Sequence, residues 1–221
     1  MNKVFNFEGP VFTFLSRLAD LFWLNLLYIL CCLPVITAGA ATTALFYVTL
    51  KMAKDEEGYI TRSFFKSFKD NFIQATLIWA AFLVVFVIMF LDFRIANGGS
   101  MAEVLSDSVV SDVVIVAVIV MAIVILMTLT YVFPLLAQFD NTVVNTVKNA
   151  FLISIRHLPY TFLMLLISAI PVALIWFSPA LLLLVLIMFS ATAYINSKFY
   201  NRIFALYMPK EEDINGEGGQ E

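Results

Sequence analysis

Uncharged, mainly apolar stretches recur along the chain, and charged residues separate them. No charge occurs in residues 21–50, 71–91, 113–139 or 158–197. A helix that crosses a bilayer needs roughly 20 mainly apolar residues, and its backbone groups must be paired within the segment. Every one of these stretches is long enough for at least one crossing. The pattern therefore predicts an all-α fold, a polytopic transmembrane helical bundle.

Breaks inside two of the stretches decide how often each one crosses. Residues 21–50 as one helix would extend about 45 Å, which exceeds a hydrocarbon core of about 30 Å. Pro34 and Gly39 interrupt this stretch, in "LPVITAG". It contains either two short crossings or one crossing followed by an amphipathic surface helix. Ser178-Pro179 divides the last stretch in the same way, since a residue before proline disfavours helix.

The positions of Lys and Arg favour six spans, because basic residues concentrate in cytoplasmic loops. With six spans and a cytoplasmic N-terminus, twelve of the thirteen basic residues lie inside and only Arg94 lies outside. Five spans leave ten inside. We therefore expect a multi-pass protein of the cell membrane with both termini in the cytoplasm. The integral membrane domain covers 1–208, the tail 209–221 is acidic and disordered, and the spans lie at about 18–35, 38–53, 71–92, 110–134, 159–177 and 180–198.

Composition agrees with a membrane protein and excludes a soluble enzyme. Of the 221 residues, 62% are hydrophobic and only 13% are charged, and the mean hydropathy is +0.95. The first twenty residues lack the pattern of a secretory signal peptide, so we expect the first apolar segment to remain in the protein. The net charge of −3 does not indicate nucleic acid as a partner. Cys31 and Cys32, the only cysteines, are neighbours and offer neither a disulfide framework nor metal-ligand spacing.

Two cytoplasmic segments are expected to form amphipathic helices. Lys54–Phe72 mixes basic residues with four phenylalanines at helical spacing, the pattern of a helix at the membrane interface. Such a helix either meets anionic lipid or docks a cytoplasmic partner. The residues expected on the docking face are Arg62, Phe65, Lys66 and Lys69.

The second amphipathic segment covers 145–162 and also leads directly into a predicted span. A shift of 86 residues places Phe65 on Phe151. Internal repeats are common in transporter folds, so the shift indicates a unit of span, interfacial helix and span that occurs twice. Amphipathic helices that precede spans can also arise without duplication.

The chain offers little for catalysis, and we expect a protein that is not an enzyme and has no cofactor. Ionisable groups inside spans usually mark function, yet Asp20, Asp70, Asp92 and Asp112 all lie at predicted span ends. His157, the single histidine, lies where a helix begins to cross.

The polar residues of the first hairpin are neutral, and we expect them to have structural roles. Asn25 lies about two turns inside its helix, where an unpaired amide is costly. We hypothesise that it bonds the Thr42/Thr43 region of the next helix. The structural residues predicted for the hairpin are Trp23, Asn25, Pro34, Thr37, Gly39, Thr42 and Thr43.

The stretch "FWLNLLYILCCLPVITAGAATTALFYVTLK", followed by "DEEGYITRSFFKSFKDNFIQAT", resembles the YesL-like family of small Gram-positive membrane proteins, a domain of unknown function. The likeness covers nearly the whole chain, most clearly from Phe22 to Thr76. It implies an association with genes for carbohydrate uptake by ABC transporters. It supplies no catalytic residues.

Two functions follow as hypotheses. The first is an accessory membrane subunit of a carbohydrate ABC importer, with ABC permease subunits as partners. The second is an autonomous sugar or small-solute transporter or channel, which acts as a homo-oligomer or alone. In both cases the lipid bilayer is a partner.

Overall fold

The computed structural model describes residues 10–56, 58–98, 108–177 and 182–208, and helices account for all regular structure in them. The expected tail 209–221 and the expected turn at Ser178-Pro179 lie outside the described residues. A short 3₁₀ helix, η1, covers Val35–Thr37. The α-helices are α1 Pro10–Cys32, α2 Ala38–Met52, α3 Ile60–Asp70, α4 Phe72–Gly98, α6 Ser108–Gln138, α7 Val143–Arg156, α8 Leu158–Phe177 and α9 Leu182–Phe204.

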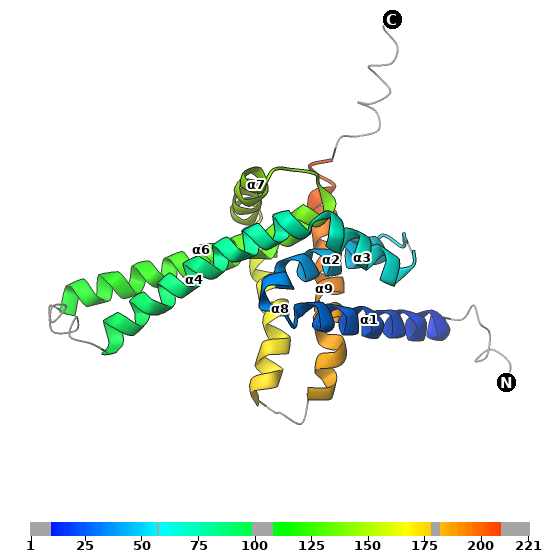
Figure 1. The fold of residues 1–221 in the computed structure, drawn as a ribbon, viewed down its shortest axis with the longest axis horizontal. Helices are drawn as coiled ribbons and strands as arrows, with labels where there is room; N and C mark the ends of the chain where they lie inside the picture. The colour runs from blue at the N-terminus through cyan, green and yellow to red at the C-terminus, as the bar shows by residue number, and fades with distance from the viewer. Residues whose placement is uncertain (1–9, 57, 99–107, 178–181, 209–221) are drawn as a thin grey trace, which may run out of the picture.

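The short helix α2 lies at the centre of the fold, where it packs against α1, α3, α4, α6 and α9 (Figure 1). More than half of its apolar window is buried, 56%, compared with 17% in α1 and in α4. From this centre α4 and α6 extend side by side to one side, and α8 and α9 extend as a second pair in a different direction (Figure 1).

The all-helical membrane fold expected from the sequence is confirmed, and the expected number of six spans stays a prediction. Four described helices are long and apolar enough to cross a membrane: Thr13–Cys32, Val35–Met52, Phe72–Asp92 and Val116–Gln138. A fifth arises if Val143–Arg156 and Leu158–Leu174, which are bent by 103°, count as one span. The sixth expected span corresponds to α9, which continues beyond Lys198 to Phe204.

The first apolar stretch divides into two helices at the expected break. α1 ends at Cys32, and η1 separates it from α2. The Thr37 hydroxyl donates to the carbonyls of Cys31 (2.6 Å) and Pro34 (2.8 Å), and Trp79 Nε1 donates to the Val35 carbonyl at 2.7 Å. These bonds pair carbonyl groups that a helix end leaves without partners. Both halves remain candidates for a crossing, as two short spans require.

Helix α6 continues through Pro134 to Gln138, although the sequence indicated an end near the proline. Proline has no N–H, so the carbonyl four residues earlier loses its usual donor. That carbonyl belongs to Thr130, and it accepts a hydrogen bond of 2.6 Å from the Tyr200 hydroxyl. The tyrosine on α9 therefore supplies the missing donor, and the helix continues.

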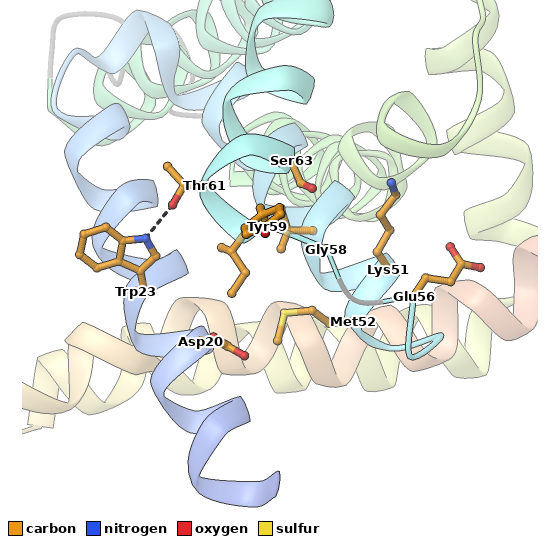
Figure 2. A pocket seen from close by; sticks show the side chains of 11 residues that line it. Asp20, Trp23, Lys51, Met52, Glu56, Gly58, Tyr59, Thr61 and Ser63 are labelled. Atoms are coloured by element: carbon orange, nitrogen blue, oxygen red, sulfur yellow. Dashed lines mark hydrogen bonds between the residues drawn. The ribbon is translucent and has the colours of Figure 1, made fainter.

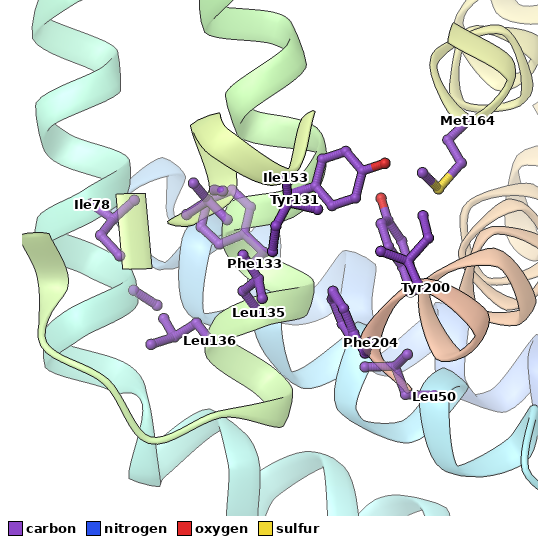
Figure 3. Close-up of a cluster of buried hydrophobic side chains, with 14 of the residues drawn as sticks. Leu50, Ile78, Tyr131, Phe133, Leu135, Leu136, Ile153, Met164, Tyr200 and Phe204 are labelled. Carbon is purple, nitrogen blue, oxygen red and sulfur yellow. The ribbon is translucent and has the colours of Figure 1, made fainter. Parts of the chain in front are cut away.

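The largest buried cluster joins α6 to α9, α7 and α8 (Figure 3). Tyr131 and Tyr200 meet edge to face with ring centroids 5.5 Å apart, and Tyr200 stacks on Phe204. Polar pairs also join α9 to α2, which contributes Leu50 to this cluster. Thr49 accepts from the Ser197 hydroxyl at 2.8 Å, and the Asn201 amide donates to the Leu50 carbonyl at 3.0 Å.

Candidate docking site

Helix α3 presents the four predicted docking residues on one exposed face. The buried side chains of the helix are Phe64 and Ser67. Arg62, Phe65, Lys66 and Lys69 lie on the opposite side, where they line a shallow depression of about 590 Å³ together with Tyr59, Ile60 and Thr61. The four residues therefore share one exposed face of α3, and their role in docking stays a prediction.

The inner side of α3 is held firmly against the core. Phe64 is fully buried in a cluster that includes Leu24 of α1 and Leu45 of α2. Trp23 on α1 donates from Nε1 to the Thr61 hydroxyl at 2.9 Å, at the first turn of α3 (Figure 2). A helix anchored on one side in this way presents its other side in a fixed orientation.

The loop before α3 is pinned by an ion pair. Arg17 on α1 pairs with the carboxylate of Asp55 and also donates to the Tyr194 hydroxyl on α9 at 2.9 Å. Asp55 adopts φ 57°, a left-handed conformation that aspartate tolerates better than most residues. One guanidinium therefore joins α1, α9 and the loop that leads to α3.

A pocket of about 300 Å³ adjoins the docking face (Figure 2). Its walls come from α1, the end of α2, the loop and the start of α3. Asp20, Glu56 and Lys51 supply charges of both signs, and Trp23 and Tyr59 supply aromatic surface. Tyr59, 84% exposed, lines both the pocket and the face of α3. The two form one continuous surface suited to binding.

A second, polar cleft lies on the other side of α3, between it and the junction of α6 and α7. Its volume is about 720 Å³. Lys66 lines it as well as the docking face, and Asp70, Gln74, Gln138 and Asp140 add carboxylate and amide groups. Within the described part of the chain, no group of three or more His, Cys, Asp or Glu side chains could hold a metal ion.

The predicted hairpin residues do not gather at one site. Trp23 alone reaches the docking site, whereas Pro34 and Thr37 form the break between α1 and α2. Gly39 lies where α2 crosses α4: a methyl group at this position would stand 2.6 Å from the Ala75 carbonyl oxygen and 2.7 Å from Trp79 Cβ. These residues shape the hairpin rather than a binding site.

The expected partner of Asn25 is wrong. Its Oδ1 accepts a hydrogen bond of 3.1 Å from the backbone N–H of Ser190 on α9, 165 residues away. Thr42 and Thr43 donate instead to carbonyls one turn earlier in their own helix, those of Ala38 and Gly39. Asn25 points to α9 because α1 packs along α9, so the amide holds two distant helices together.

Sequence reasoning missed Asp20, Glu56, Tyr59 and Thr61 as lining residues. Asp20 ends an apolar stretch and Glu56 lies in a polar loop, and neither position indicates a shared pocket. Thr61 could have been suspected, because it stands one residue before Arg62, the first basic residue of the amphipathic pattern.

Comparison with known proteins finds one family and one curated relative. Residues 21–93 match the model of the family described as "Protein of unknown function, DUF624", so the match covers α1 from Leu21, α2, α3 and most of α4. YteU of Bacillus subtilis, an uncharacterized protein, is 29% identical over 150 residues, which is 67% of this chain and 63% of YteU. The aligned part thus spans less than two thirds of that relative. No solved structure matches the chain.

The matched segment supports the resemblance seen in the sequence. It contains the stretch from Phe22 to Thr76 and therefore Trp23, the loop and all of α3. Neither match carries a statement about carbohydrate uptake.

Proposed function

We propose that this protein is an accessory, non-catalytic integral membrane protein of a carbohydrate ABC uptake system, located in the cell membrane with both termini in the cytoplasm. The basic, aromatic face of α3 is its docking surface for a permease subunit. One observation carries the proposal: α3 is anchored on its inner side and offers Arg62, Phe65, Lys66 and Lys69 together on its outer side.

The charges of this face are available to a partner. Within the described residues, Arg62, Lys66 and Lys69 make no ion pair. Such charges contribute more to orientation and to the rate of association than to affinity, while a partly exposed aromatic ring between them contributes apolar contact. An acidic surface with an apolar centre would complement the face.

The carbohydrate context rests on the YesL-like resemblance, which the family match supports at the level of the family only. The polar residues between helices fit a supporting role. Asn196 donates to Ser168 at 2.9 Å, and Ser197 donates to Thr49 at 2.8 Å. Groups that pair across helices fix the positions of the helices.

Charge reversal tests the docking face. The double variant Lys66→Glu/Lys69→Glu should keep the protein in the membrane but reduce recovery of its partners in mild detergent by roughly tenfold or more, which corresponds to 1.4 kcal/mol. The readout is quantitative mass spectrometry of proteins that co-purify with the tagged full chain from its native membrane. Permease, ATPase or binding-protein subunits in fixed proportion are the expected partners.

Lys54→Glu/Arg202→Glu is the matched control, because it makes the same change of charge at two exposed residues outside the depression. The control should retain the partners. Equal recovery from both double variants, or a homo-oligomer without ABC subunits, would contradict the proposal.

The polar cleft beside α3 favours the alternative, an autonomous sugar or small-solute transporter. Transporter sites occur at the junction of internal repeats, and this cleft lies between the two segments that the 86-residue shift relates. Purified protein in liposomes should then move a labelled sugar without any partner.

A further inference from the structure

The structure contains the same unit twice. Three element boundaries recur after 86 residues: α2 ends at Met52 and α6 at Gln138, α3 ends at Asp70 and α7 at Arg156, and α4 begins at Phe72 and α8 at Leu158. In each copy one residue separates the amphipathic helix from the following helix. The unit α2, α3, α4 is therefore repeated by α6, α7, α8.

Burial follows the same shift. Each residue of the following pairs is at most 7% exposed: Phe64 and Ala150, Ser67 and Ile153, Ala75 and Thr161, Ile78 and Met164. Amphipathic helices that arose independently would have no reason to share this register across a helix break. The inner faces of α3 and α7 are thus equivalent, and their outer faces can be compared position by position.

The outer faces agree at two positions and differ at two. Arg62 corresponds to Lys148, and Phe65 corresponds to Phe151; the two phenylalanines are each 37% exposed. Lys66 and Lys69, however, correspond to Leu152 and Ile155, which are 53% and 46% exposed. Together with the exposed Val144, α7 carries an apolar strip where α3 carries a basic one.

The bend after α7 shows where this strip faces. The axes of α7 and α8 differ by 103° across His157. If α8 crosses the bilayer, α7 must run along its surface. The apolar strip also continues round the bend onto α8 through the exposed side chains of Leu158 and Phe162. If α8 crosses the bilayer, the exposed side chains of Leu158 and Phe162 face lipid at the end of α8 that adjoins the strip.

We propose that the outer face of α7, formed by Val144, Phe151, Leu152 and Ile155, lies in the boundary between headgroups and acyl chains of the cytoplasmic leaflet. Lys148 lies within this face, one turn from Val144 and one turn from Leu152, and Arg156 lies at its edge; both are exposed, so their cationic groups can reach anionic headgroups while their stems follow the apolar surface. The two copies of the unit have therefore diverged, so that α7 holds lipid and α3 remains in water.

Position 152 and its repeat equivalent 66 form a matched pair for the test. In a background with Cys31→Ser and Cys32→Ser, single variants Leu152→Cys and Lys66→Cys are labelled with an environment-sensitive fluorophore. The full chain is reconstituted in vesicles of phosphatidylcholine and phosphatidylglycerol. Ile155→Cys provides a second site on α7 if Leu152→Cys does not elute from a sizing column like the parent.

The label on α7 should emit at shorter wavelength and be quenched by lipids that carry a spin label near the headgroup. Iodide should quench the label at position 66 several-fold more strongly than the label at position 152. Strong quenching of the label at position 152 by iodide, without quenching by the spin-labelled lipids, would overturn the proposal, because the face would then be in water. Protection from both quenchers would also overturn it, since protein, such as a second copy of the chain, would then cover the face.

The result is independent of the proposed function. A label at position 66 that behaves like the one at 152 would leave the lipid contact of α7 intact and would argue against a water-exposed docking face on α3.

Discussion

Replacement of Gly39 by alanine tests the packing at the centre of the fold. α2 and α4 approach so closely here that an added methyl group would stand 2.6 Å from the Ala75 carbonyl oxygen and 2.7 Å from Trp79 Cβ. The first of these atoms is backbone and cannot rotate away, so α4 must move. That movement would also stretch the 2.7 Å hydrogen bond from Trp79 Nε1 to the Val35 carbonyl.

The magnitude follows from three contributions. Overpacking costs about 1–3 kcal/mol, and the strained hydrogen bond costs about 1 kcal/mol. The better helix propensity of alanine returns about 1 kcal/mol. We expect Gly39→Ala to lower the free energy of unfolding by about 1–3 kcal/mol, and for a chain of this size each kcal/mol lowers Tm by about 2–4 °C.

Thermal unfolding of the purified protein in mild detergent measures the effect. Gly58→Ala is the matched control, because its added methyl group would meet only Ser63 Oγ at 3.7 Å, an ordinary contact. The control should leave Tm unchanged or raise it slightly, since alanine restricts the unfolded chain. If Gly39→Ala and Gly58→Ala have the same Tm, the close approach of α2 and α4 is not a determinant of stability.

Two further substitutions have defined outcomes. Asn25→Leu keeps a similar volume but removes the acceptor for the Ser190 N–H. In a denaturant titration it should therefore lower the free energy of unfolding by about 1 kcal/mol or more. Asn149→Leu, at an exposed site, is the control and should lower it much less. Burial, and to a smaller extent Arg156, lowers the pKa of His157. Protonation therefore favours the unfolded state, so Tm of the parent should fall relative to His157→Gln as the pH drops below about 6.5. Parallel Tm curves from pH about 7.5 to about 5.5 would contradict this expectation.

The amphipathic helices could be predicted because their signal is local. The periodicity of Phe64, Phe65 and Phe68 among basic residues indicates both the helix and its two faces, and α3 follows that pattern. The break in "LPVITAG" was equally clear, because Pro34 is unsuited to the interior of a helix. Signals of this kind need no knowledge of the neighbouring helices.

The partners of polar side chains could not be predicted, because they depend on which helices meet. Asn25 was recognised as a residue that needs a partner, yet Ser190 lies 165 residues away on a helix whose position no local pattern indicates. The continuation of α6 through Pro134 could not be predicted for the same reason, because it also depends on a residue of a distant helix. The Tyr200 hydroxyl donates to the Thr130 carbonyl, which would otherwise have lost its donor to the proline.

Hydropathy predicts the length of an apolar helix but not its direction. The α4–α6 pair and the α8–α9 pair leave the core in different directions (Figure 1), although their sequences are similarly apolar. Single residues, Asn71 before α4 and His157 before α8, form the breaks at which two of these helices begin. By length and composition, four helices of the described residues are candidates for a crossing, or five with the bent pair of α7 and α8, and the six expected spans stay a prediction.

In the two copies of the unit, inner residues determine where a helix packs, and outer residues determine what it contacts. Inner residues such as Phe64 and Ala150 differ greatly in size, yet both remain fully buried at equivalent positions. The position of each helix thus follows the shared register of the unit, and it tolerates changes in the volume of a single inner side chain. In our proposals, the choice between lipid and protein depends instead on two outer positions, Lys66 and Lys69 in α3 against Leu152 and Ile155 in α7. A duplicated unit can therefore acquire a second surface by outer substitutions while its inner positions remain buried.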